Sequence, residues 1–324
     1  MTMEAPSIVF FRVGIAALGM ALWLSLTAPS LLRLPKGTTL SVLGVGLLIG
    51  AHWVCFFWSI SLSNISVALA GFATISLFTA ITEPLIERRP VRATELLCGG
   101  IVIAGILLIA GLEREYLSGL LVALVGALLA AIFPVFNRLL VKQGHSSRSL
   151  LLYEMTGACF FAALAIPFID PYHLQVPTGK DWLPLLTLAI ICTLIAHTWN
   201  IHLLRRLTAY TANLSMNFEP VWGILFGAVI FHEYKHLHPA FYLGTALIIA
   251  AICEIAGALI TGGNVVETIS SGIINIGTIP DRTAFSWAML SALLAAGLLV
   301  NVSTWTRAPI STTHTVVGGV AGAG

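Results

Sequence analysis

Apolar residues along the chain gather into ten segments, separated by short stretches that hold most of the charged residues. The segments are 7–27, 39–61, 65–86, 93–111, 116–137, 149–169, 183–204, 209–231, 239–261 and 284–301. A helix needs roughly 20 apolar residues to cross the ~30 Å of hydrocarbon in a bilayer, where the backbone must satisfy its own hydrogen bonds. The pattern therefore predicts an all-α integral membrane protein with about ten transmembrane helices.

Composition agrees with this pattern and excludes a soluble protein. The 324 residues are 58% hydrophobic and only 9% charged, too few charges to solvate the surface of a soluble domain of this size. The five cysteines all lie in apolar segments without CxxC spacing and are expected to be small buried residues. We expect neither an enzyme nor a nucleic-acid-binding protein, and no cofactor or metal.

Lysine and arginine concentrate in alternate loops. One set of loops, which includes 88–92, 138–148 and 205–206, holds 11 of these residues, and the intervening set holds 4. The positive-inside rule makes the first set cytoplasmic, as in a multi-pass protein of the cell's inner membrane. It also places the N-terminus outside, which predicts a further helix before Met1.

Two segments show the same pattern at a long interval. Ile65–Glu87 and Thr211–Glu233 have equal lengths, and their terminal glutamates are 146 residues apart. We interpret each as one membrane-spanning helix. The loop charges make the first run inward and the second outward, so the pair predicts inverted repeats of five helices, the first truncated.

Polar side chains are densest in the seventh and eighth segments, 183–204 and 209–231. His197 and Asn200 are three residues apart on one helical face. Pro220 lacks an amide hydrogen, so the helix is expected to break there, which lipid tolerates only beside protein or a water-filled cavity. The candidate substrate-cavity residues are His197, Asn200, Asn213, Asn217, Glu219 and Pro220. The alternative is a purely structural role.

Three other polar residues in apolar segments have simpler interpretations. Arg12 is expected either to face a polar cavity or to reach the outer interface. His52 is expected to be a packing residue. Glu83 lies one turn from Arg88, Arg89 and Arg92, which favours an ion pair with that loop at the interface.

The chain up to about residue 250 resembles the EamA domain of the drug/metabolite transporter superfamily. Glu219-Pro220, His232-Glu233 and Gly244 match the motif of its second repeat, and Glu87 and Gly99 match the first, where Ala73 and Thr74 replace the acid-proline pair. Pro6 and Arg12 resemble its second helix. The resemblance implies a first repeat over 1–111 that lacks its first helix, and a second over 112–250. It also implies secondary transport of small organic solutes, often export of metabolites or amino acids.

The tail, 251–324, resembles the inorganic phosphate transporter (PiT) family. Its Pro309-Ile310-Ser311-Thr312-Thr313-His314 run is followed by Gly318 and Gly319, which suits an oxyanion in a partial re-entrant hairpin. The phosphate-motif candidates are Ser311, Thr312, Thr313 and His314. That family's Gly-Ala-Asn-Asp type partner hairpin is absent. We therefore interpret the chain as a hybrid joined within 246–257, with phosphate permease activity, or an inactive truncated hybrid from wrong gene boundaries, as alternatives.

One string matches an enzyme motif. His232-Glu233-Tyr234-Lys235-His236 fits the H-E-x-x-H pattern of zinc peptidases, but His238-Pro239 ends any helix two residues later. We therefore expect a transporter. Its expected partners are a small-molecule substrate and the lipid bilayer; a proton, carried by Glu219 or His197, or another coupling ion, and a homodimer, are left open.

Overall fold

The computed structural model describes residues 3–88, 90–91, 104–105, 108–109, 114–169, 174–216 and 218–260. The chain divides into two compact units, Met1–Ile255 and Ala256–Gly324, and nearly all described residues belong to the first. The predicted segment 284–301 and the phosphate-like motif at 309–319 lie outside the described residues, as does most of 93–111.

Within the described residues every regular element is helical. Four helices are long and continuous, α1 (Ala5–Thr27), α2 (Lys36–Leu62), α6 (Leu117–Lys142) and α7 (Ser147–Ile169), and α12 spans Pro239–Ile260. Short 3-10 turns are η1 (Pro29–Leu32), η2 (Arg114–Tyr116) and η4 (Glu233–Lys235). Six spans in this part of the chain are long and apolar enough to cross a membrane. This supports the multi-pass membrane protein that the apolar pattern predicts.

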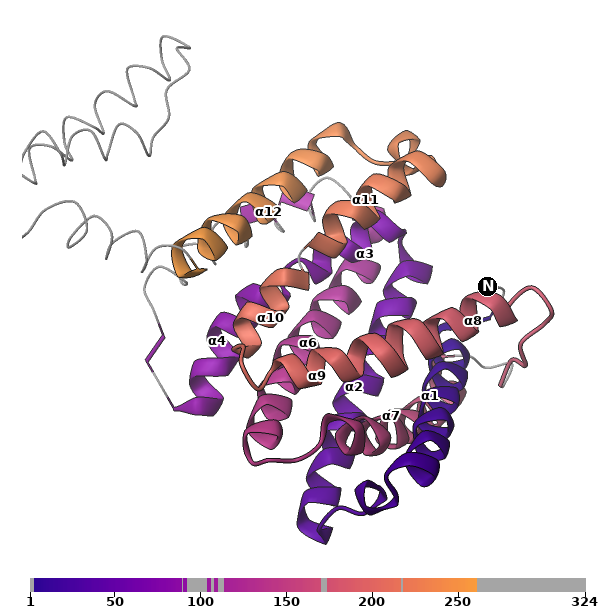
Figure 1. The fold of residues 1–324 in the computed structure, drawn as a ribbon. Helices are drawn as coiled ribbons and strands as arrows, with labels where there is room; N and C mark the ends of the chain where they lie inside the picture. Colours follow the sequence, from indigo (N-terminus) through magenta and orange to yellow (C-terminus); the bar gives the residue numbers. More distant parts are fainter. Residues whose placement is uncertain are drawn as a thin grey trace, which may run out of the picture. The chain divides into compact units, whose positions relative to one another are not determined.

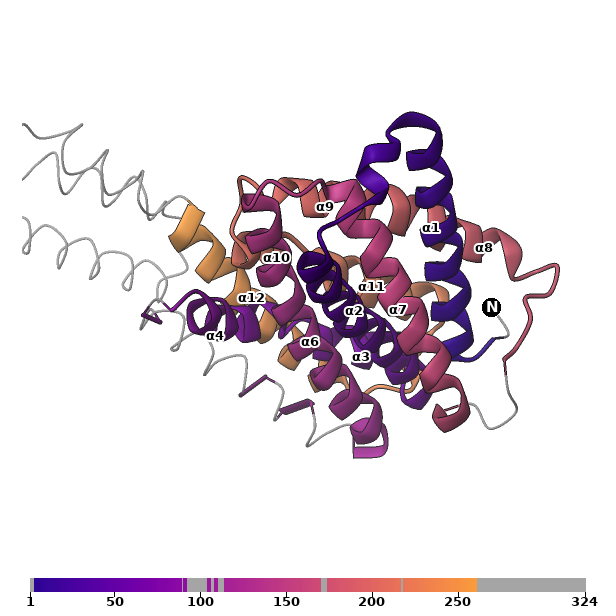
Figure 2. The same ribbon diagram turned by 90° about the horizontal axis from the view of Figure 1, so that it is seen from below.

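The tightest packing joins α1, α2 and α7, which lie together in both views (Figures 1 and 2). Glycines allow α2 and α7 to touch through their backbones. A Cβ on Gly50 would lie 2.9 Å from the Cα of Ala158, and one on Gly157 would overlap the carbonyl oxygen of Leu43. Small residues at such crossings let membrane helices approach closely.

The segment predicted as one helix over 65–86 consists of α3 (Ile65–Phe72) and α4 (Ile75–Glu87). At the junction the amide and the hydroxyl of Thr74 both donate to the carbonyl of Gly71, the latter at 2.7 Å, so a tight turn replaces the regular helical bond. The hydroxyl competes with the helical ladder, as threonine can. The sequence analysis was therefore wrong to treat this segment as one continuous helix.

Within the second predicted helix of the pair, Thr211–Glu233, the structure describes α10 (Ala209–Met216) and α11 (Phe218–Ile230), and Asn217 between them lies outside the described residues. Pro220 is the third residue of α11. A proline at this position lacks the amide that would bond to the carbonyl of Met216 in a continuous helix. The expected break near Pro220 stays a prediction.

The two helix pairs, α3–α4 and α10–α11, pack side by side in opposite directions. α3 packs against α11, and α4 packs against α10 (Figure 1). Because α3 meets α11 and α4 meets α10, the segment α3–α4 runs antiparallel to the segment α10–α11.

The start of each of these two helix pairs is capped by a glutamate from near the end of the other pair. Glu83, fully buried near the end of α4, accepts hydrogen bonds from the amides of Ala209 and Tyr210, each at 3.1 Å, at the start of α10. Glu233, after α11, accepts from the amides of Ile65 at 2.9 Å and Ser66 at 3.0 Å, at the start of α3. Carboxylates suit helix N-termini, where backbone amides have no partner within the helix.

The seventh apolar segment contains three consecutive elements, α8 (Trp182–Leu186), η3 (Thr187–Ile195) and α9 (Ala196–Leu203). η3 is a π-helix, a wider winding that is rare and often found at functional sites. This span is the least buried of the six.

Candidate solute cavity and buried polar network

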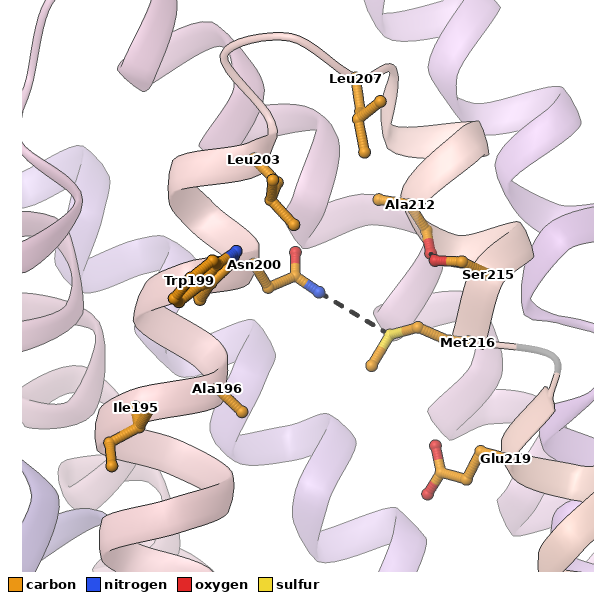
Figure 3. A pocket seen from close by; sticks show the side chains of 10 residues that line it. All are labelled: Ile195, Ala196, Trp199, Asn200, Leu203, Leu207, Ala212, Ser215, Met216 and Glu219. Carbon is orange, nitrogen blue, oxygen red and sulfur yellow. Dashed lines mark hydrogen bonds between the residues drawn. The ribbon is translucent and has the colours of Figure 1, made fainter. Parts of the chain in front are cut away.

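A cavity of about 500 Å³ lies between α9 on one side and α10 with the start of α11 on the other (Figure 3). Its walls are mainly apolar, with a few polar side chains. It is lined by Ile195, Ala196, Trp199, Asn200, Leu203, Leu207, Ala212, Ser215, Met216 and Glu219.

The polar groups of the cavity come from both sides of it. In Figure 3 the amide of Asn200 points from α9 toward Met216, whose sulfur it meets at 3.9 Å, and the carboxylate of Glu219 points into the same space. Glu219 is the second residue of α11 and therefore lies in its first turn. A mainly apolar pocket with a few convergent polar groups is the usual form of a small-molecule site.

The structure separates the residues that the sequence analysis grouped. Asn200 and Glu219 line the cavity, whereas Asn213 is buried and its amide donates to the hydroxyl of Thr79 at 2.8 Å and the carbonyl of Ala130 at 3.3 Å. The backbone of Pro220 lies in the first turn of α11. The remaining candidates, Asn217, Ser311, Thr312, Thr313 and His314, lie outside the described residues.

His197 lies on a different face of α9 from the residues that line the cavity, and it belongs to a buried polar network. Its Nε2 lies 3.2 Å from Oε2 of Glu154 on α7, and its ring meets the ring of Trp53 edge-on at 5.8 Å. Arg12 covers the other side of this network. Its guanidinium carbon lies 4.0 Å from the Trp53 ring centroid, and its Nε donates to the hydroxyl of Thr193 in η3 at 2.7 Å.

Arg12 therefore lies buried inside the bundle, against Thr193 and Trp53, instead of at the outer interface, and it is not among the residues that line the cavity. A buried cation gains from an aromatic face and from a hydrogen-bond acceptor when it leaves water.

Glu154 is the polar residue that the sequence analysis missed. It is fully buried, and within the described residues its Oε1 has no hydrogen-bond partner. A lone acid inside an otherwise apolar segment, 149–169, was the available signal, because intramembrane acids are costly and generally functional.

Glu83 and His52 occupy different surroundings. Glu83 is buried at the start of α10 and forms an ion pair with Arg138 of α6, at 3.4 Å. Arg89 and Arg92 lie outside the described residues, so the ion pair expected between Glu83 and that loop stays a prediction. Nδ1 of His52 lies 3.0 Å from the carbonyl of Gly126, which agrees with the packing role expected for it.

The H-E-x-x-H string does not form one helix. His232 has a left-handed backbone conformation with φ of 57°, η4 follows it, and the carboxylate of Glu233 is occupied by the start of α3. Among the described residues, no group of three or more His, Cys, Asp or Glu side chains is arranged to hold a metal ion.

Residues 239–324 match the phosphate transporter family. A protein of Helicobacter pylori strain 26695, provisionally named a phosphate permease, is 48% identical over 85 residues, which are 26% of this chain and 16% of that protein. A similarly named protein of Mycobacterium bovis, Mb2302, is 48% identical over 79 residues, covering 24% of this chain and 14% of its own length. The chain thus spans about one sixth of the length of these relatives.

The remainder of the chain matches another family. A crystal structure that covers 81% of this chain and 90% of its own superposes with a TM-score of 0.59 at 18% identity, which shows a shared fold. The EamA-like transporter family matches residues 2–111 and 117–257, and this match overlaps the phosphate transporter match. Because these two ranges cover well over half of the chain, the protein belongs to the EamA-like transporter family.

Proposed function

We propose that the chain is a secondary transporter of small organic solutes, with the cavity between α9 and α10–α11 as its substrate site. The observation that carries the proposal is the position of Asn200 and Glu219 in one cavity, in a member of a transporter family. A mainly apolar pocket in which a few polar groups converge suits a small organic solute.

The chemistry of the cavity favours a solute with a cationic or amine group and an apolar part. The carboxylate of Glu219 would accept hydrogen bonds from an ammonium group, and Asn200 can both donate and accept. The exposed indole of Trp199 and the surrounding aliphatic side chains would contact the apolar part. Amino acids and related metabolites have this combination, and export is the direction that the family resemblance favours.

Alternating access would require the walls of the cavity to move relative to one another, so that it opens to each side of the membrane in turn. The antiparallel packing of α3–α4 with α10–α11 supports inverted repeats over 1–111 and 112–250 in a protein of about ten helices. The contact between the basic stretches 138–148 and 205–207 also supports an inner-membrane orientation: Arg138 Nε donates to the carbonyl of Leu207 at 3.2 Å, and Arg205 donates to that of His145 at 3.1 Å.

Glu219→Gln is expected to reduce solute flux about tenfold to a hundredfold, because hydrogen bonds to charged groups contribute about 1.5–3 kcal/mol. Flux would be measured as efflux of a radiolabelled amino-acid mixture from proteoliposomes. Glu115→Gln, at an exposed glutamate of η2, is the matched control and should transport as the wild type does. Unchanged flux in both Glu219→Gln and Asn200→Ala would remove the cavity from the transport path.

The match over residues 239–324 favours phosphate permease activity of the C-terminal part as a second candidate function. This candidate predicts uptake of radiolabelled phosphate that is lost in a Ser311→Ala, Thr312→Ala double variant, because the hydroxyls would bind the oxyanion. Glu219→Gln should leave that uptake unchanged, since Glu219 lines the cavity between α9 and α10–α11 and is not part of the phosphate motif. Absence of phosphate uptake by the wild-type protein would contradict this candidate.

A further inference from the structure

We infer that Glu154 and His197 form a proton-binding pair whose occupancy is coupled to the solute cavity. The inference rests on the proposed transport function and names its coupling ion. It is carried by a fully buried carboxylate that contacts an imidazole at 3.2 Å across two helices and has one oxygen without a partner among the described residues.

The contact between the two side chains provides a place for one proton. Nε2 of His197 and Oε2 of Glu154 are close enough to share a hydrogen bond, and the exposed fractions of the two side chains are 11% and 0%. A bound proton makes the pair neutral overall, whether it resides on the acid or on the imidazole. Without it, the pair carries a buried negative charge, which is costly unless a cation compensates.

The titratable and charged groups around the pair come from the elements packed against α7. They are Arg12 of α1, His52 of α2, Cys159 of α7 itself and Cys192 of η3. Arg12 is the cation of this network, because its guanidinium and the imidazole of His197 both contact the ring of Trp53. His52 is separated from His197 by the ring of Phe133, at centroid distances of 5.7 and 6.1 Å.

The pair and the cavity are joined through η3 and α9. Arg12 donates to Thr193 of η3, and Ile195 and Ala196, which follow in the same span, line the cavity. A proton on the pair and a cationic group in the cavity are like charges on two faces of α9, so each disfavours the other. By linkage, proton binding weakens binding of the cationic solute to the same degree, which is the behaviour of an exchanger.

α9 provides a mechanical link as well. It carries His197 toward α7 and, three residues later, Asn200 into the cavity. A change in the Glu154–His197 contact therefore acts on the helix that forms one wall of the cavity.

The site can be tested without a known solute, on the purified full chain in detergent. A buried protonated carboxylic acid gives a carbonyl stretch in infrared difference spectra between two pH values, and this band should be absent from Glu154→Gln. An imidazolium 5.8 Å from an indole quenches its fluorescence, so a pH-dependent part of the tryptophan emission should be lost in both His197→Gln and Trp53→Phe. Thr156→Val, at an exposed threonine of the same helix, should keep both signals.

Coupling is tested in proteoliposomes with a radiolabelled amino-acid mixture. A gradient of one pH unit should drive about tenfold accumulation in a one-for-one exchange. Glu154→Gln should lower the accumulation to the level seen without a gradient, and Thr156→Val should behave as the wild type does.

The outcomes separate this inference from the proposed function. Wild-type flux that ignores the pH gradient would overturn the coupling and leave the transporter intact. If Glu154→Gln keeps the carbonyl band and His197→Gln keeps the pH-dependent tryptophan emission, the proton site is overturned, whatever the flux. Absence of any solute flux, with both signals present and removed by these variants, would overturn the proposed function and support the proton site.

Discussion

Gly46→Ala is expected to lower the free energy of unfolding by about 3 kcal/mol, the upper part of the usual range for overpacking. A Cβ at Gly46 would lie 2.9 Å from the Cα of Glu154 and closer still to its carbonyl oxygen. Both obstacles are backbone atoms of α7, so no side chain can turn away to make room. The variant must separate α2 from α7 along the most closely packed crossing of the bundle.

Gly44→Ala is the matched control for this prediction. It lies on the same helix two residues earlier, and a Cβ there would meet nothing within 4 Å. Because alanine favours helix over glycine by up to about 1 kcal/mol, this variant should be neutral or slightly more stable. Unfolding by denaturant in detergent micelles, followed by tryptophan fluorescence, compares the two. Equal free energies of unfolding for Gly46→Ala and Gly44→Ala would show that α2 and α7 are not in close backbone contact at Gly46.

Glu233→Ala is expected to cost about 3 kcal/mol, because it removes a charged acceptor and leaves buried donors unpaired. The donors are the amides of Ile65 and Ser66 and the hydroxyl of Ser66, all at the first turn of α3. Glu233→Gln keeps the volume and one acceptor oxygen, so its loss should be about half as large.

The first turn of α3 should also exchange its amide hydrogens faster in Glu233→Ala, which hydrogen-exchange mass spectrometry would detect. Lys235→Ala is the control, since it removes an exposed charge two residues away without touching α3. If Glu233→Ala and Lys235→Ala unfold at the same denaturant concentration, Glu233 does not stabilise α3.

The apolar pattern predicts the transmembrane segments well because span length is a local property that the thickness of the bilayer imposes. The prediction of a break near Pro220 rests on one residue and is equally local. The break after Phe72 has a weaker signal, since a threonine such as Thr74 interrupts a helix only when its hydroxyl finds a nearby carbonyl.

The partners of buried polar groups could not be predicted, because they join residues far apart in the chain. Glu83 and Ala209 are 126 residues apart, and Glu154 and His197 are 43 apart. Spacing on a helix shows which side chains share a face, and so it grouped His197 with Asn200. It does not show which neighbouring helix each side chain meets, and in the structure these two point to different ones.

The backbone contact between α2 and α7 limits how this protein can move. Helices that touch through glycines leave no space for sliding, so we expect α2 and α7 to behave as a fixed frame. The span from α8 to α9 is wound partly as a π-helix, is the least buried and forms one wall of the cavity. Any movement that carries a solute across the membrane therefore has to come from α8–α9 and from α10–α11 on the other side of the cavity, relative to a fixed frame.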